Sequence, residues 1–548
     1  MSGVRAGDKG GGNKSGRTSC GSERPGAEGA GAEAASRLDG RSASAKQIRG
    51  SSILLVGRFL SMAANFGIGV LTVRYLTKSD YGAFAYALSI VTLGETVVTL
   101  GLDRAITRFV PIYEEREEYS KLWGTLVMVV GVVGGLGLGI CLLMVGLQNW
   151  IAGTLITERQ VVSLLTILIV LSPVQALDGV LIGMFSVFSK PSAIFFRRHV
   201  LAPALKLTVV LLLILGHAGV EFLAVGYVLT GVAGVAIYTW ILIRVLRTRG
   251  LLAHFGWRRM NVPVAEVFSF TIPLLTSDLV YSVMNTTNSV LLGRYGGTAE
   301  VADFRAVQPA ARLNQVVFTS FLLLFTPLAA RLFARDDREG ISELYWQTAI
   351  WLAIFSFPIF ALTSSLAHPI TVMLYGARYE SSATYLALMS VGYYFNAALG
   401  FNGLTLKVFG ILRYIVVLNL GATLVNLGLN FLLIPRYGAL GAAVGTCGTL
   451  IVHNILKQVG LRLGTGIDIF DWRYLRIYLV ITASAVALWQ VQIWASPNAV
   501  VAVALVALAS LVVLRVGRSQ LDIAEVFPEL LRLPLAHRLL GTDRRTRS

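Results

Sequence analysis

The sequence has little charge and almost no cysteine for its length. Of its 548 residues, 14% are charged and 3 are cysteines, whereas soluble proteins carry about 25% charged residues. Cys20 stands in a polar tail, and Cys141 and Cys447 stand inside apolar runs, so the cysteines form neither a metal-ligand pattern nor a disulfide framework. The shortage of charge excludes a soluble enzyme, and the cysteines predict neither a metal site nor a redox site.

Catalytic motifs are also absent from the sequence. We find no Walker motif, no paired catalytic carboxylates and no nucleophile elbow, so we expect neither an enzyme nor a cofactor. The glycine-rich run 134–139 resembles a phosphate loop, but it lies in the middle of an apolar block with no strand before it. Gly131, Gly135 and Gly139 instead predict a ridge of small residues for close helix packing.

Long apolar blocks dominate the chain. Hydrophobic residues make up 55% of it, the mean hydropathy is +0.69, and many blocks reach the ~20 residues that cross a bilayer as a helix. We therefore predict an all-α polytopic membrane protein with 14 transmembrane helices. These run approximately over 51–73, 81–103, 122–147, 161–186, 194–215, 220–243, 264–291, 300–330, 344–367, 381–405, 414–434, 439–461, 475–495 and 498–514.

The positions of Lys and Arg predict the orientation. Both tails and the loops on the side of the N-terminus hold most of these residues, and this side is therefore predicted to be cytoplasmic. The net charge of +17 then favours anionic lipid headgroups as neighbours and disfavours nucleic acid. The loops predicted to lie outside hold only Arg74, Lys78, Arg159, Arg294, Arg378 and Arg436.

An internal repeat divides the apolar blocks into two sets of six. Arg74-Tyr75 matches Arg294-Tyr295 at an offset of 220, and residues 224–226 match 443–445 at an offset of 219. We predict two pseudo-symmetric six-helix bundles related by an axis along the membrane normal, plus two extra C-terminal helices. The predicted parts are a disordered cytoplasmic tail (1–49), a first bundle (50–247), a cytoplasmic linker (248–263), a second bundle (264–463), two helices (464–515) and a cytoplasmic tail (516–548) with an interfacial helix near 521–540.

Charged residues inside the predicted spans are functional candidates, because a charge at the bilayer centre costs about 2.5–3.5 kcal/mol. The cations are Arg58, Lys206, Arg305 and Arg312, and the acids are Glu95, Asp178 and Asp278. Arg312 is too deep to reach either surface, whereas Arg58 and Arg305 are shallow enough that snorkelling remains an alternative. Glu95 and Asp278 either neutralise these cations or bind H⁺ or Na⁺, and Asp178 fits a structural role better.

Uncharged polar residues follow the same helix faces. Asn65 lies seven residues after Arg58, Asn285 lies seven after Asp278, and Gln315 lies three after Arg312. Such stripes must face the bundle interior or water. We therefore predict one hydrated cavity between the bundles, lined by the first, second, seventh and eighth spans.

Three segments resemble a known family. They are VLTVRYLTKSDYG (70–82), GLDRAITRFV (101–110) and IPRYGALGAA (434–443), together with Asn419, Asn426 and Asn430. These segments are similar to the polysaccharide-export flippases of the multidrug/oligosaccharidyl-lipid/polysaccharide (MOP) exporter superfamily, such as the O-antigen translocases. The resemblance covers about residues 50–463.

The resemblance implies two bundles that alternate between inward-open and outward-open states, and a polyprenyl-pyrophosphate-linked sugar as substrate. Arg312 and Arg58, helped by Arg305 and Lys206, are then expected to hold the pyrophosphate, with Asn65, Asn285 and Gln315 facing sugar or water. The expected location is a prokaryotic cytoplasmic membrane with both termini inside. An undecaprenyl-type glycan lipid is the expected partner, and coupling to H⁺ or Na⁺ and contact with glycan polymerase or export machinery remain open.

Three alternatives stay open beside this hypothesis. Two additional helices resemble those of the lipid II flippases, in which such a pair helps to house the lipid tail. A cation-coupled drug antiporter is less favoured, because the first span carries Arg58 where that branch has an acid. A membrane glycan polymerase would need a sizeable outer loop, and the predicted outer loops are short.

Overall fold

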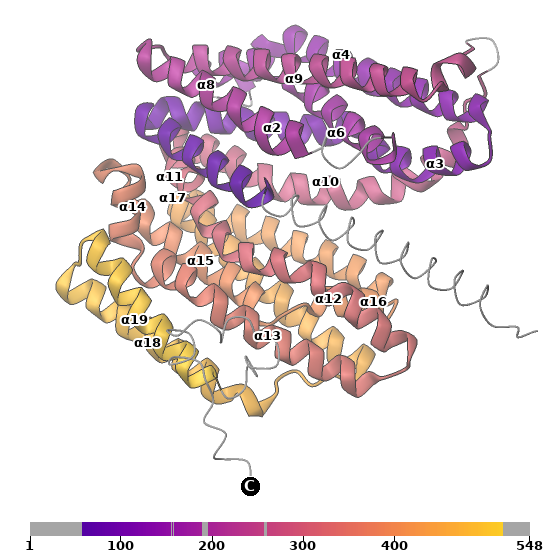
Figure 1. Cartoon of the computed structure of the whole chain (residues 1–548). Coiled ribbons are helices and arrows are strands. Elements are labelled where there is room, and N and C mark those ends of the chain that lie inside the picture. Colours follow the sequence, from indigo (N-terminus) through magenta and orange to yellow (C-terminus); the bar gives the residue numbers. More distant parts are fainter. Residues whose placement is uncertain (1–56, 155, 157, 189–194, 257–259, 519–548) are drawn as a thin grey trace, which may run out of the picture. The chain divides into compact units, whose positions relative to one another are not determined.

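The computed structural model describes residues 57–154, 156, 158–188, 195–256 and 260–518 (Figure 1). In these ranges the chain is helical with short connections and contains no strand, so the predicted all-α polytopic class is confirmed. From Gly57 onward the chain forms one compact unit, and the boundaries between two bundles stay a prediction. The tail 1–49 and the helix predicted near 521–540 lie outside the described residues.

The N-terminal half, here residues 57–248, begins with a helix over 57–75. The π-helical turn Phe196–Leu201 leads directly into helix α8 (Ala202–Leu215). The other helices of this half are α2 (Lys78–Thr99), α3 (Leu102–Glu115), α4 (Tyr119–Thr154), α5 (Arg159–Leu168), α6 (Leu171–Phe188) and α9 (Val220–Thr248).

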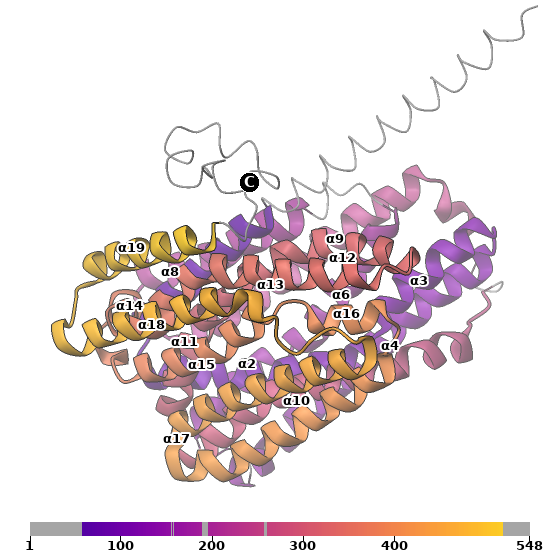
Figure 2. The ribbon, with the colours of Figure 1, turned by 90° about the horizontal axis from the view of Figure 1, so that it is seen from below.

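The C-terminal half, here residues 264–465, is followed by two more helices, α18 (Leu475–Ala495) and α19 (Ala499–Gly517). Those two lie side by side, and α19 packs on α13 (Figures 1 and 2). The helices of the half itself are α10 (Val264–Tyr295), α11 (Gly297–Arg312), α12 (Val316–Ala334), α13 (Arg338–Phe360), α14 (Ala367–Tyr375), α15 (Ser382–Ala398), α16 (Asn402–Val408) and α17 (Leu412–Thr465).

Each predicted span overlaps at least one helix in the described ranges. Eight helices there are long and apolar enough to cross a membrane, or nine if the bent pair Gly297–Leu322 and Phe325–Ala334 is one span. Breaks in the helices account for part of the difference, since α15 ends before α16, and α17 counts once although it is kinked. The helix over 57–75 and α10 are unbroken but are not among the helices apolar enough to be counted. The number fourteen therefore stays a prediction.

The two halves share a buried core. One apolar cluster contains Phe84 and Val91 of α2, Phe304 and Val307 of α11, and Ile434 of α17. The start of α10 joins a second cluster, which otherwise consists of side chains from the N-terminal half and from the segment that follows it. Helix α10 therefore packs against both halves, because it begins against the N-terminal half and contacts α2 as well as α11 and α17.

The predicted glycine ridge on α4 does not make the expected close contacts. A Cβ added at Gly131, Gly135 or Gly139 would meet no atom within 4 Å, whereas one at Gly137 would overlap Pro173 of α6. The close approach is thus made from another face of α4. The spacing of small residues located the helix correctly but selected the wrong face, because glycines occupy several faces of this helix.

Helix α17 is kinked at Gly438, where the backbone has φ 54° and ψ −133°. This conformation is open to glycine and strained for residues with a Cβ. Pro435 lies one turn earlier, and the Glu300 carboxylate of α11 accepts a hydrogen bond from the Ala439 N–H beyond the kink. The kink therefore separates the two spans predicted over 414–434 and 439–461. The hydrogen bond to Glu300 connects α11 to α17 just beyond the kink.

We expect Gly438→Ala to destabilise the protein by about 1–3 kcal/mol, the usual range for a residue forced into a disfavoured backbone region. Its Cβ would also lie 2.5 Å from a Glu300 carboxylate oxygen. Thermal unfolding of the purified protein in detergent measures the effect. Gly428→Ala on the same helix is the control, because a Cβ there meets nothing within 4 Å and alanine favours a helix. Equal stability of the two variants would contradict this account.

Candidate functional site

A cavity of about 460 Å³ lies between α2 of the N-terminal half and α10 and α11 of the C-terminal half. Most of the residues that line it have polar side chains. Three of the four predicted helices thus line a shared cavity, and the helix over 57–75 does not. Besides hydroxyl and phenol groups, the lining carries Asp278, Asn285, Arg305, Gln308 and Arg312.

Arg305 is held from four directions by neutral acceptors. Its guanidinium donates to Ser289 Oγ at 2.7 Å, to the Asn285 carbonyl at 2.8 Å, to Gln308 Oε1 at 2.9 Å and to Ser89 Oγ at 2.8 Å. Ser89 belongs to α2, and the other three residues belong to α10 and α11. The side chain therefore points into the contact between the halves and does not snorkel toward the surface.

Arg312 makes fewer contacts and is half-buried in the same cavity. Its Nε–H donates to the Tyr393 hydroxyl at 3.2 Å, and Nη2 donates to Asn285 Oδ1 at 3.1 Å. A guanidinium has five N–H groups, so three remain without an acceptor in the described part of the chain. This side chain can thus donate several charge-assisted hydrogen bonds to an anion in the cavity.

The acid of the cavity is already neutralised. Asp278 Oδ1 accepts a hydrogen bond from Arg104 Nη2 at 2.8 Å, and both side chains are partly exposed. Arg104 lies on α3, in the segment that sequence reasoning assigned to a cytoplasmic loop. In the described ranges no acid lies within ion-pair distance of Arg305 or Arg312. The cavity is therefore cationic.

The other predicted site residues lie elsewhere. Arg58 and Asn65 are exposed on the helix over 57–75, and Asn65 Nδ2 donates to the Ser61 carbonyl at 2.7 Å. Gln315 ends the short 3₁₀ turn after α11 and is not in the cavity lining. Of the predicted substrate-binding residues, the cavity thus brings together Asn285, Arg305 and Arg312.

A second polar cavity, of about 500 Å³, lies inside the N-terminal half. It contains Glu95, Asp178, Lys206 and Gln175, from α2, α6 and α8. The Lys206 ammonium also lies 5.6 Å from the centre of the Tyr227 ring. Lys206 and Glu95 therefore line one cavity, and Arg305 and Arg312, with which they were grouped, line another.

Sequence reasoning missed Ser89, Ser289 and Tyr393, which orient the two arginines. These neutral residues give no sequence signal, because serine and threonine in membrane helices usually bond to their own backbone. Arg104 could have been found from its place in the segment 101–110, which carries the family resemblance. Its position after the end of an apolar block hid it.

The predicted outer end of the cavity is closed by contacts between the halves. Lys78 Nζ lies 2.7 Å from Asp303 Oδ1, and the hydroxyls of Ser79 and Thr298 are 3.1 Å apart. At Gly82 the α2 backbone comes so close to α11 that an added Cβ would overlap the Thr298 carbonyl. We call these contacts between α2 and α11 the outer seam.

Two arginines extend the outer seam reciprocally. Arg74 of the N-terminal half donates to the carbonyls of Met373 and Leu374 at the end of α14, the second at 2.8 Å. Arg378 of the C-terminal half donates to the carbonyls of Val73 and Arg74, the second at 2.7 Å. Cations favour helix C-termini, where carbonyls lack partners. Each half therefore caps a helix of the other half.

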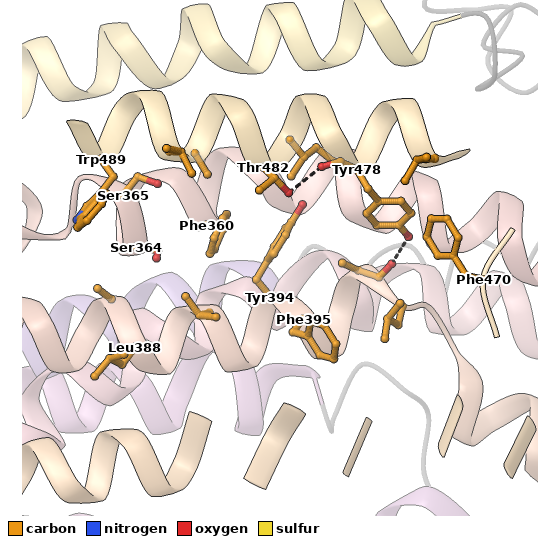
Figure 3. Close-up of a pocket in the computed structure, with 18 residues that line it drawn as sticks. Phe360, Ser364, Ser365, Leu388, Tyr394, Phe395, Phe470, Tyr478, Thr482 and Trp489 are labelled. Carbon is orange, nitrogen blue, oxygen red and sulfur yellow. Dashed lines mark hydrogen bonds between the residues drawn. The ribbon is translucent and has the colours of Figure 1, made fainter. Parts of the chain in front are cut away.

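An apolar groove of about 700 Å³ lies on the far side of α15, between it, the end of α13 and α18 (Figure 3). Phe360, Tyr394, Phe395 and Trp489 line it together with aliphatic side chains. Tyr394 donates to the Ala353 carbonyl at 2.9 Å, which satisfies its hydroxyl. Because Tyr393 contacts Arg312 and Tyr394 faces the groove, α15 separates the cationic cavity from the apolar groove.

A family model described as polysaccharide biosynthesis protein matches residues 48–333, about half of the chain. The chain belongs to this family. A second model, MatE, matches residues 273–432. The family model covers helix 57–75 and α2 to α11, and so all helices that line the cationic cavity.

Two curated proteins are similar to this family member over most of their length. An uncharacterised membrane protein of Methanocaldococcus jannaschii is 23% identical over 422 residues, which is 74% of this chain and 82% of that protein. Stage V sporulation protein B of Bacillus subtilis is 22% identical over 436 residues, 75% of this chain and 83% of that protein.

Two solved structures show the fold. The lipid II flippase MurJ in an inward closed conformation has a TM-score of 0.66 at 14% identity, covering 85% of this chain and 99% of that one. A multidrug resistance MATE family transporter of the MOP superfamily, in an inward-facing conformation, has a TM-score of 0.59 at 13% identity, with 74% and 94% covered. Family and fold together support a flippase or transporter of the MOP superfamily.

Proposed function

We propose that this family member is a flippase that moves a polyprenyl-pyrophosphate-linked oligosaccharide from the cytoplasmic to the outer leaflet. The observation that carries the proposal is the cationic cavity, in which three N–H groups of Arg312 remain available beside Arg305. An anion inside hydrocarbon needs such partners, and a guanidinium binds phosphate oxygens bidentately. The proposed location is the cytoplasmic membrane, with both termini inside.

The lining of the cavity suits the rest of the headgroup. Asn285, Gln308 and the hydroxyls of Thr92 and Thr96 line the same space, and amides and hydroxyls both donate and accept hydrogen bonds, as a sugar requires. The apolar groove beside α18 offers the lipid chain a surface without charged groups. The substrate proposed here therefore has a site for its charge, its sugars and its tail.

A lipid II flippase is the second candidate, because its substrate differs from the proposed one in the sugar and not in the pyrophosphate. It is favoured by α18 and α19, which lie outside the predicted internal repeat, and α18 forms one wall of the groove. A drug antiporter is less favoured, since the described lining of the cavity is cationic and would repel a cationic drug. Coupling to H⁺ or Na⁺ through Glu95 and contact with glycan-assembly machinery remain proposals.

Mass spectrometry of the lipid-linked intermediates in cells depleted of the protein tests this proposal. We expect a polyprenyl-pyrophosphate-linked oligosaccharide to accumulate at least several-fold, because its transfer to the outer leaflet stops. Accumulation of lipid II alone would assign the second candidate. An unchanged pool of every pyrophosphate-linked glycan would refute both.

A further inference from the structure

Arg305 donates one hydrogen bond to a residue outside the C-terminal half to which it belongs. Three of its four acceptors belong to the C-terminal half, where α10 and α11 are adjacent. The fourth, Ser89 Oγ of α2, is its only described acceptor in the N-terminal half. Arg305 is therefore a partly buried connection across the surface along which the two halves must separate.

Ser89 is the centre of this connection. Its hydroxyl also contacts Ser289 Oγ at 3.0 Å, and its carbonyl accepts a hydrogen bond from Thr286 Oγ1 at 3.0 Å. Ser89 and Ser289 are both buried, so these bonds are shielded from water. Ser89 lies two helical turns after Gly82 on α2. Its hydrogen bonds therefore form the inner end of the contact between the halves that begins at the outer seam.

The charge of Arg305 is balanced by dipoles alone. All four of its acceptors are neutral, so no opposite charge holds the guanidinium, and an anion in the cavity would add a Coulomb attraction that these dipoles do not supply. Arg312 follows Arg305 by seven residues, about 10 Å along the helix, and lines the same cavity. An anion held by Arg312 therefore attracts the Arg305 guanidinium toward the cavity and away from Ser89.

We propose that Arg305 is a latch between the halves, which the anionic group of the substrate releases by drawing the guanidinium away from Ser89. The proposal rests on the proposed function, because it takes the pyrophosphate as that anion. Arg312 binds the substrate, and Arg305 makes opening of the outer seam depend on the substrate's charge. An empty transporter then stays closed at its outer end.

The test measures the distance between the outer ends of the two halves in the full-length protein. Spin labels at Glu221→Cys and Ser381→Cys, which are both exposed, report it by pulsed electron paramagnetic resonance after the native cysteines are replaced by alanine. Ser89→Ala removes the cross-half acceptor and leaves Arg305 its three other bonds. Ser163→Ala, at an exposed position of α5, is the matched control.

We expect Ser89→Ala without ligand to increase the long-distance population about tenfold over wild type, as for the loss of one charged hydrogen bond. Farnesyl pyrophosphate, the probe, should increase that population in wild type and in Ser163→Ala, and change it little in Ser89→Ala. Normal elution of each variant in size exclusion shows that it is folded.

Two results would overturn the latch. One is a wild-type distance distribution in ligand-free Ser89→Ala, and the other is a probe that binds through Arg312 without changing the distance. Binding of the probe is measured separately by calorimetry. Failure of the probe to bind wild type refutes the pyrophosphate site, whereas binding without a change of distance refutes the latch alone.

Discussion

Arg312→Ala is expected to abolish export of the glycan while the protein still inserts into the membrane and folds. The substitution removes the guanidinium whose three available N–H groups face the cavity. The four hydrogen bonds of Arg305 do not involve Arg312 and are kept. Hydrogen bonds to charged groups contribute about 1.5–3 kcal/mol each, which corresponds to about 10- to 150-fold in affinity for each bond lost. Arg312→Lys keeps the charge but loses the planar fork, so it should recover only part of the activity.

The assay is surface glycan in cells that express each variant at equal level, with binding of a prenyl pyrophosphate to the purified protein as the second measurement. Arg331→Ala is the control, because it removes the same charge at the exposed end of α12. Export at the wild-type level in Arg312→Ala would remove this residue from the substrate site. A loss in both variants would indicate a general effect of charge.

Gly82→Ala should reduce transport at least tenfold by a different route. A Cβ at this position would overlap the backbone carbonyl of Thr298, and a backbone atom cannot turn aside as a flexible side chain can. Overpacking of this kind costs about 1–3 kcal/mol, and here the cost falls only on the state in which the outer seam is closed. The variant should therefore favour an open outer end.

Cysteine-accessibility labelling from outside detects this shift, with a cysteine introduced at Thr92 in the cavity as reporter. Gly135→Ala on α4 serves as the comparison, since its Cβ meets no atom within 4 Å. If Gly82→Ala labels and transports like wild type, the close contact of α2 with α11 is not part of the transport cycle.

Much of the fold follows from simple properties of the sequence. The cost of exposing backbone to hydrocarbon makes each apolar block a helix, which is why the predicted ranges coincide with helices. The breaks within them depend on local backbone geometry, as at Gly438, and hydropathy does not report it. For the same reason the predicted number of spans is not established by helix lengths alone.

The candidate site was predictable where it is charged. Arg312 and Asn285 were found because a charge or an amide inside the membrane is costly and needs a polar partner. Ser89 and Tyr393 were missed, since a single hydroxyl carries no such cost and its partner lies far away in the sequence. Arg58 was grouped with the cavity by the polar stripe that it shares with Asn65, whereas the structure exposes both residues.

The most direct test of the central claim is a flipping assay with purified protein in liposomes that contain a fluorescent polyprenyl-pyrophosphate-linked oligosaccharide. A membrane-impermeant glycosidase added outside reports the fraction of glycan exposed there. The account predicts that wild type and Arg331→Ala expose glycan that was protected inside, and that Arg312→Ala does not. Equal movement with and without Arg312, or no movement in wild type, would contradict it.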